Sequence, residues 1–187
     1  MNIPFLSFHG MHDPLKAEIT KAFRKVYDSH WYIMGNELKQ FEANYAAYSK
    51  TKYSIGVANG LDALIISLKA LNIGSGDEVI VPSNTYIATW LAVTAVGARP
   101  VPVEPDPATH NIDPAAIERL ITPQTTGILG VHLWGNPCAV EALTEIAHRH
   151  NLKLLFDAAH AFACSHAGRM VGNFGDAEVF SFHATKF

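Results

Sequence analysis

Short apolar segments alternate with amphipathic segments along most of this chain of 187 residues, and this alternation constrains its fold more than any other feature. Apolar residues at helical spacing predict helices over residues 14–29, 37–49, 62–71, 86–96, 113–121 and 140–150. Runs rich in β-branched and aliphatic residues predict strands over residues 53–58, 78–81, 99–103, 126–133, 152–157 and 177–182. Because buried parallel strands are apolar on both faces, the pattern predicts an α/β fold with three layers, α/β/α, around a mostly parallel central sheet.

Composition excludes several classes of protein. Hydrophobic residues make up 49% and charged residues 17% of the chain, which is too apolar for a disordered protein. Fourteen Lys and Arg against 17 Asp and Glu give a net charge of −3 without a basic stripe, which argues against nucleic-acid binding. No apolar stretch is long enough to span a membrane, and residues 1–8 do not resemble a signal peptide. The two cysteines, Cys138 and Cys164, cannot form a disulfide framework, so we expect a cytoplasmic protein.

Polar and glycine residues gather where the expected strands end. In parallel α/β sheets, ligands bind at the carboxyl ends of the strands. The sequence therefore predicts a ligand site at this edge of the sheet. The residues concerned are Asn59-Gly60, Ser83-Asn84-Thr85, His132 to Asn136, Asp157 and Ser181.

Three features could carry chemistry, and each also has an ordinary structural interpretation. The turn at 59–62 is either an anion site at a helix start or a simple turn with an N-cap. Asp157 ends an apolar strand, where it either caps the next turn or binds a protonated ring nitrogen. Lys186 is either a solvated lysine or a desolvated amine available for a Schiff base.

Other catalytic and metal-binding motifs are missing from the sequence. There is no Walker loop, no dinucleotide-binding G-x-G-x-x-G and no G-x-S-x-G elbow. His160, His166 and His183 lie near strand ends, which raises the possibility of a metal site. Neither H-E-x-x-H nor C-x-x-C is present to complete such a site, so we expect no metal.

Five motifs occur in a fixed order from the first half of the chain to its end. Taken together, they resemble the sugar aminotransferase (DegT/StrS) family of fold type I pyridoxal-phosphate enzymes, and the resemblance extends over nearly the whole chain from Pro4 onward. The motifs are GVANGLDAL (56–64), GDEVIVPSNTYIAT (76–89), VHLWG (131–135), DAAH (157–160) and SFHATK (181–186).

The resemblance implies roles for two charged residues. Lys186 would hold pyridoxal 5'-phosphate (PLP) as a Schiff base. Once the lysine amine is released from this bond, it would move the proton between substrate and cofactor. Asp157 would keep the pyridine nitrogen of the cofactor protonated, so that the ring withdraws electrons from the substrate.

The resemblance also implies which residues surround the cofactor. Gly60 and Leu61 would donate backbone N–H groups to the phosphate, and Ser181 would add its hydroxyl. Tyr86 would stack on the pyridine ring, and His160 would lie near the phenolic oxygen. Leu61 departs from the threonine that is common in the family, so only its backbone contact can be transferred.

The implied reaction transfers an amino group from an amino acid, expected to be glutamate, to a nucleotide-linked keto-sugar. The lysine replaces the histidine of the related dehydratases, which favours transamination over deoxygenation. Residues 59–62 and 84–86 resemble members that act on dTDP-linked 3-keto sugars, whereas 132–138 and 181–186 equally resemble members that act at the 4-keto position. The position therefore stays open.

Other functions are compatible with the same residues. A PLP-dependent sugar dehydratase and an aminotransferase for a non-sugar ketone such as an inosose use similar chemistry. A catalytically inactive fragment or a binding module could also keep the fold.

The family pattern continues well beyond the Schiff-base lysine, and its active sites form between two subunits. We therefore expect residues 1–187 to be an N-terminal arm and part of a large PLP-binding domain, without the small C-terminal domain, in a protein that forms homodimers. We also expect this piece alone to expose apolar sheet surface and to have weak or no activity.

Overall fold

The computed structural model describes residues 3–5 and 7–186, and it divides into two compact units, Met1–Tyr45 and Ala46–Phe187. The first unit contains the helices α1 (His9–His12) and α2 (Lys16–Ser29) and most of α3 (Asn36–Ser49), which continues into the second unit. An exposed ion pair joins Lys25 to Glu37 at 2.8 Å within the first unit. The two long helices predicted in this region are confirmed, whereas the short helix α1 was not predicted.

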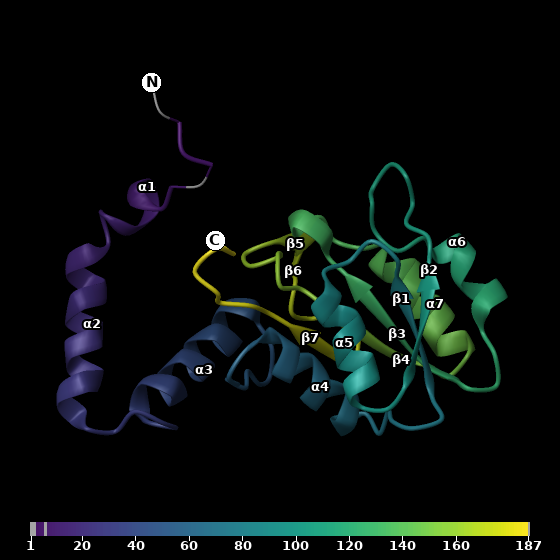
Figure 1. Cartoon of the computed structure of the whole chain (residues 1–187), viewed down its shortest axis with the longest axis horizontal. Coiled ribbons are helices and arrows are strands. Elements are labelled where there is room, and N and C mark those ends of the chain that lie inside the picture. The colour runs from purple at the N-terminus through teal and green to yellow at the C-terminus, as the bar shows by residue number, and fades with distance from the viewer. Residues whose placement is uncertain (1–2, 6, 187) are drawn as a thin grey trace. The chain divides into compact units, whose positions relative to one another are not determined.

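The second unit is built on a five-stranded sheet in which every neighbouring pair is parallel (Figure 1). This arrangement confirms the predicted parallel sheet. The strand order is β2-β1-β3-β4-β7, so β2 and β7 form the two edges. The strands are β1 (Glu78–Pro82), β2 (Arg99–Val103), β3 (Thr125–Val131), β4 (Lys153–Asp157) and β7 (Ala177–Val179).

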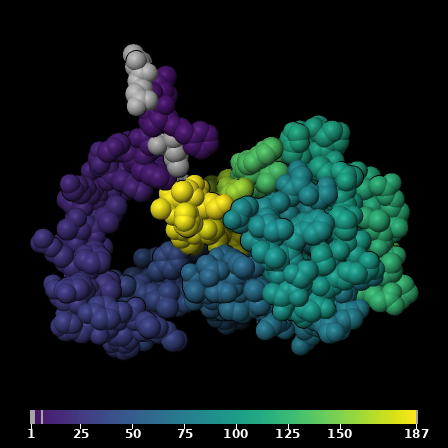
Figure 2. All heavy atoms as spheres, in the orientation of Figure 1, coloured from purple at the N-terminus to yellow at the C-terminus, as the bar shows by residue number. Residues whose placement is uncertain are grey.

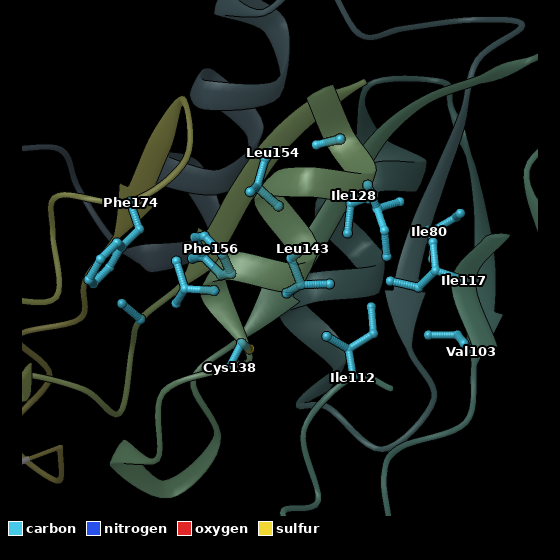
Figure 3. Close-up of a cluster of buried hydrophobic side chains, with 14 of the residues drawn as sticks. Ile80, Val103, Ile112, Ile117, Ile128, Cys138, Leu143, Leu154, Phe156 and Phe174 are labelled. Carbon is cyan, nitrogen blue, oxygen red and sulfur yellow. The ribbon is translucent and has the colours of Figure 1, made fainter. Parts of the chain in front are cut away.

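Helices cover both faces of this sheet, which confirms the three-layer architecture (Figure 1). On one face, side chains of α4 and α5 pack in a buried cluster with Val79 and Val81. On the other face, α6 and α7 pack in a second cluster with Ile80, Ile128 and Phe156, and Figure 3 shows these side chains around Leu143. The helical elements of this unit are α4 (Gly60–Ala70), α5 (Ile87–Ala95), α6 (Pro114–Ile117), η1 (Glu118–Leu120), η2 (Leu133–Gly135) and α7 (Val140–Arg149), and a hairpin is formed by β5 (Ser165–His166) and β6 (Arg169–Met170).

The strand predicted over residues 53–58 is wrong, because this segment has no regular secondary structure. Its alternating residues Tyr53, Ile55 and Val57 are exposed instead of packing on the sheet. An alternating pattern does not form a strand unless a neighbouring strand supplies ladder hydrogen bonds, and this segment is not paired in the sheet. The apolar side chains of this segment are therefore exposed to solvent, whereas those of the central strands β1, β3 and β4 are mostly buried.

Candidate functional site

The turn before α4 leaves two backbone N–H groups free. Asn59 is the N-cap: its Oδ1 accepts a hydrogen bond from the backbone N–H of Asp62 at 2.9 Å. Its Nδ2 donates to the Asp62 carboxylate at 2.8 Å. The N–H groups of Gly60 and Leu61 find no acceptor among the described residues. The N-cap and the anion-binding interpretations of this turn are therefore compatible, since free N–H groups at a helix start attract anions.

Ser181 lies beside this turn although it is far away in the sequence. A β-carbon placed on Gly60 would be 3.8 Å from the Ser181 Cβ, so the two residues are in van der Waals range. Ser181 belongs to the segment that follows β7 and leads to Lys186. Figure 2 shows this C-terminal segment, in yellow, at the surface of the second unit. Ser181 and the start of α4 are therefore neighbours, and the Ser181 hydroxyl accepts the His183 N–H at 3.4 Å.

Asp157 is a buried carboxylate at the carboxyl end of β4, with 6% of its surface exposed. The Thr89 hydroxyl donates to its Oδ2 at 2.9 Å, and the Ala159 N–H donates to its Oδ1 at 3.1 Å. Thr89 is itself buried on α5. No cationic side chain of the described residues forms an ion pair with Asp157. A buried carboxylate with only neutral donors suits a protonated ligand nitrogen, which would supply the missing positive charge.

Lys186 and His160 are in direct contact. The Lys186 Nζ lies 2.9 Å from the His160 Nε2 and 5.7 Å from the centre of the Tyr86 ring. The Trp134 backbone N–H donates to the other ring nitrogen, Nδ1, at 3.4 Å. Burial lowers the pKa of His160, and the positive charge that Lys186 carries when it is protonated lowers this pKa further, while Asp157 opposes both effects.

All seven predicted site residues thus fall into two structural groups. In the first group, His160 and Tyr86 lie next to the Lys186 Nζ, and the charge of Asp157 acts on His160. Gly60 and Ser181 meet at the start of α4. Leu61 lies in the same turn, where its backbone N–H is free.

Two residues of this region were missed as contributors, although both lie in the motifs. Thr89 lies on an apolar helix, and a buried hydroxyl requires a hydrogen-bond partner. A hydroxyl among apolar residues was therefore the signal that could have identified it. Trp134 contributes through its backbone N–H, for which the sequence carries no signal. Among the described residues, no group of three or more His, Cys, Asp or Glu is arranged to hold a metal ion. The helices described are all too short or too polar to cross a bilayer.

Comparison with known proteins extends these observations. Residues 13–187 match the model of the DegT/DnrJ/EryC1/StrS aminotransferase family. The chain is 49% identical over its whole length to the erythromycin biosynthesis sensory transduction protein EryC1 of Saccharopolyspora erythraea, and 51% identical over 96% of its length to a dTDP-3-amino-3,6-dideoxy-alpha-D-galactopyranose transaminase of Aneurinibacillus thermoaerophilus. It covers 51% and 50% of those two proteins, so it spans about half the length of these curated relatives.

A similar solved structure is that of DesV from S. venezuelae in complex with a ketimine intermediate. It superimposes with a TM-score of 0.94 at 48% sequence identity, over 97% of this chain and 49% of DesV. A solved DegT DnrJ EryC1 StrS aminotransferase from Brucella abortus has the same fold, with a TM-score of 0.91 at 31% identity over 97% of this chain and 51% of that one.

Proposed function

The chain belongs to the DegT/DnrJ/EryC1/StrS aminotransferase family, and from this premise we propose that the protein is a PLP-dependent aminotransferase acting on a nucleotide-linked keto-deoxysugar. The observation that carries the proposal is the contact of Lys186 Nζ with His160 Nε2 at 2.9 Å. His160 also lies near enough to Asp157 to be affected by its charge, and Asp157 is buried without a cationic partner among the described residues. An amine that can form a Schiff base and a carboxylate that can bind a ring nitrogen are the two groups this chemistry requires.

The start of α4 fits the phosphate of the cofactor. The free N–H groups of Gly60 and Leu61 point out of the first turn of an 11-residue helix, where the helix dipole favours a negative charge. Ser181 lies next to Gly60 and would add its hydroxyl. Leu61 has no side-chain hydroxyl, so it would contribute through its backbone alone.

The remaining residues fit the ring of the cofactor. When bound, PLP supplies an electron sink that stabilises the negative charge left when an amino acid loses its α proton. Asp157, held in place by Thr89, would keep the ring nitrogen protonated. Lys186 would hold the cofactor through Nζ and would carry the transferred proton at the same atom when Nζ is free. Tyr86 would lie against the ring, and His160 would lie near its phenolic oxygen.

We propose glutamate as the amino donor and a nucleotide-linked 3- or 4-keto-deoxysugar as the acceptor. The name of the Aneurinibacillus transaminase, which refers to a dTDP-linked amino sugar, supports the class of acceptor. A lysine at position 186 supports amino transfer rather than deoxygenation. In this proposal residues 1–187 supply an N-terminal arm and part of the cofactor-binding domain of a homodimeric enzyme.

Absorbance spectroscopy tests the proposal directly. Adding PLP to the purified full-length protein is expected to give the visible band of lysine-bound cofactor, and Lys186→Ala is expected to abolish it. Lys153→Ala removes an exposed lysine at the start of β4 and is the matched control, which should keep the band. Glutamate should then convert the band to that of the pyridoxamine form, and a panel of nucleotide-linked 3-keto and 4-keto sugars should restore it selectively. A wild-type protein without the band would overturn the proposal.

A further inference from the structure

A buried asparagine binds the segment that follows β3. Asn111 is 3% exposed, and its Nδ2 donates to the carbonyl oxygens of Asn136 and Pro137 at 2.9 and 3.1 Å. Its Oδ1 accepts from the backbone N–H of Leu133 at 3.1 Å. All three side-chain hydrogen bonds of Asn111 therefore fix the backbone of one segment, residues 133–137.

This segment is held in a conformation that it would not adopt alone. Trp134 has φ 54° and ψ 25°, in the left-handed region that non-glycine residues rarely occupy. Such a conformation persists only where the surroundings enforce it. The following residue, Gly135, packs closely on the backbone of residue 160, since a β-carbon there would be 3.2 Å from the His160 carbonyl oxygen. The segment is thus tied to Asn111 on one side and packed against His160 on the other.

The enforced conformation aims the Trp134 N–H at the Nδ1 of His160. A ring nitrogen that accepts a hydrogen bond carries no proton, so the neutral imidazole must carry its proton on Nε2. That nitrogen faces the Nζ of Lys186 at 2.9 Å. An N–H on Nε2 can donate only to the lone pair of a neutral amine. A charged ammonium would instead need Nε2 as an acceptor, which moves the ring proton to Nδ1 and breaks the bond from Trp134.

We propose that Asn111 and the segment 133–137 are positioning elements that lock His160 in its Nε2–H form and thereby direct this N–H at the Nζ of Lys186. This inference deepens the proposed function and rests on it for the role of Lys186. Three other groups face the pair: the Asp157 carboxylate, the Tyr86 ring, and His183, whose carbonyl oxygen accepts the Lys186 backbone N–H at 2.9 Å. None of them donates a hydrogen bond to the Nδ1 of His160, so the tautomer depends on the Trp134 N–H.

The first test is a measurement on the unmodified, cofactor-free protein. Nitrogen-15 NMR of the histidine rings distinguishes the two tautomers, and we expect His160 to have its proton on Nε2. A neutral His160 with its proton on Nδ1 would overturn the proposal. This measurement needs no variant and no enzymatic activity, so its failure leaves the PLP absorbance test of the function intact.

The second test follows the reactivity of Lys186 with formaldehyde and cyanoborohydride, measured by peptide mass spectrometry at one pH. In Asn111→Ala we expect the rate at Lys186 to fall by about two- to tenfold, the ratio that corresponds to one neutral hydrogen bond. Asn173→Ala removes comparable asparagine contacts, to the carbonyl oxygens of Ser49 and Met170, without touching residues 133–137, and should leave the rate unchanged. Trp134→Gly keeps the N–H and suits a positive φ, so it should keep both the wild-type rate and the tautomer.

An unchanged rate and tautomer in a folded Asn111→Ala protein would refute the positioning role. If Asn111→Ala does not fold, the tautomer of His160 in the wild type and in Trp134→Gly tests the proposal instead. A change of tautomer in Trp134→Gly would refute it, because the indole ring, rather than the backbone N–H, would then fix His160.

Discussion

The buried pair of His132 and Glu178 is expected to contribute more to stability than any exposed ion pair of the second unit. The two side chains are 0% and 1% exposed, and the His132 Nε2 lies 3.0 Å from the Glu178 Oε1. The Cys138 N–H donates to the His132 Nδ1 at 3.0 Å, so the ring proton is on Nε2 and points at the carboxylate. The Phe174 N–H donates to the other carboxylate oxygen at 3.0 Å. The imidazole also stacks on Phe156, with 4.6 Å between the ring centres.

Replacing His132 by alanine removes several of these contacts at once. The hydrogen bond to a charged carboxylate is worth about 1.5–3 kcal/mol, and the Cys138 N–H left without an acceptor costs about 1–3 kcal/mol. Loss of the stacked ring leaves a cavity beside Phe156. Such terms are not additive, and removing one partner of a buried pair typically costs about 3–5 kcal/mol. We expect His132→Ala to lower the free energy of unfolding by this amount.

Urea unfolding followed by circular dichroism measures the effect. The control is Glu145→Ala, which removes an exposed carboxylate that pairs with Arg149 at 2.9 Å, and it should cost only a few tenths of a kcal/mol. The double variant His132→Ala, Glu178→Ala should cost less than the sum of the two single variants by about 1.5 kcal/mol or more, because neither group is then left unpaired. A loss below about 1 kcal/mol for His132→Ala, with an unchanged denaturant slope, would refute this reasoning.

Three further outcomes are expected. Burial raises the pKa of Cys138 to about 12, so iodoacetamide at about pH 8 should alkylate the half-buried Cys164 and leave Cys138 unmodified until the protein unfolds, as peptide mass spectrometry would show. The Thr122 hydroxyl, and to a smaller extent Arg99, lowers the pKa of Glu78 below its usual 4.5. The stability that this carboxylate contributes is therefore present above pH 4.5 and is lost as the pH falls below it. Urea midpoints should therefore drop less on acidification in Glu78→Gln than in the wild type. Asn59→Ala should cost about 0.5–2 kcal/mol through the lost N-cap of α4, and equal midpoints for variant and wild type would contradict that role.

The elements that the sequence predicted well are those whose signal is local. Strands β1 and β4 are continuous apolar runs because both of their faces are buried, and periodicity detects that burial. Segment 53–58 also has a local strand signal, an alternation of apolar residues, but it has no partner strand. Pairing is a long-range property that periodicity does not contain. The edge position of β2 was available in the sequence, since Pro100 and Pro102 lack the N–H groups that an interior strand would need.

The residues of the candidate site also differ in whether the sequence carries a local signal for them. Asp157 and Lys186 could be named because the motifs DAAH (157–160) and SFHATK (181–186) resemble those of the family. The hydrogen bond that holds Asp157 comes from Thr89, 68 residues earlier, and the one that orients His160 comes from a backbone N–H. Contacts of this kind depend on how strands and helices come together, so only the structure reveals them.

Strand register explains how two buried carboxylates coexist at one end of the sheet. Glu178 of β7 pairs with Phe156 of β4, and Val179 pairs with Asp157. Because side chains alternate between faces, Glu178 lies with His132 on the α7 face while Asp157 lies with α5 on the other. A shift of β7 by one residue would bring Glu178 to the α5 face beside Asp157, where like charges repel, and would leave His132 without its acceptor. The pair that stabilises the fold therefore also fixes the register that keeps a second carboxylate away from Asp157.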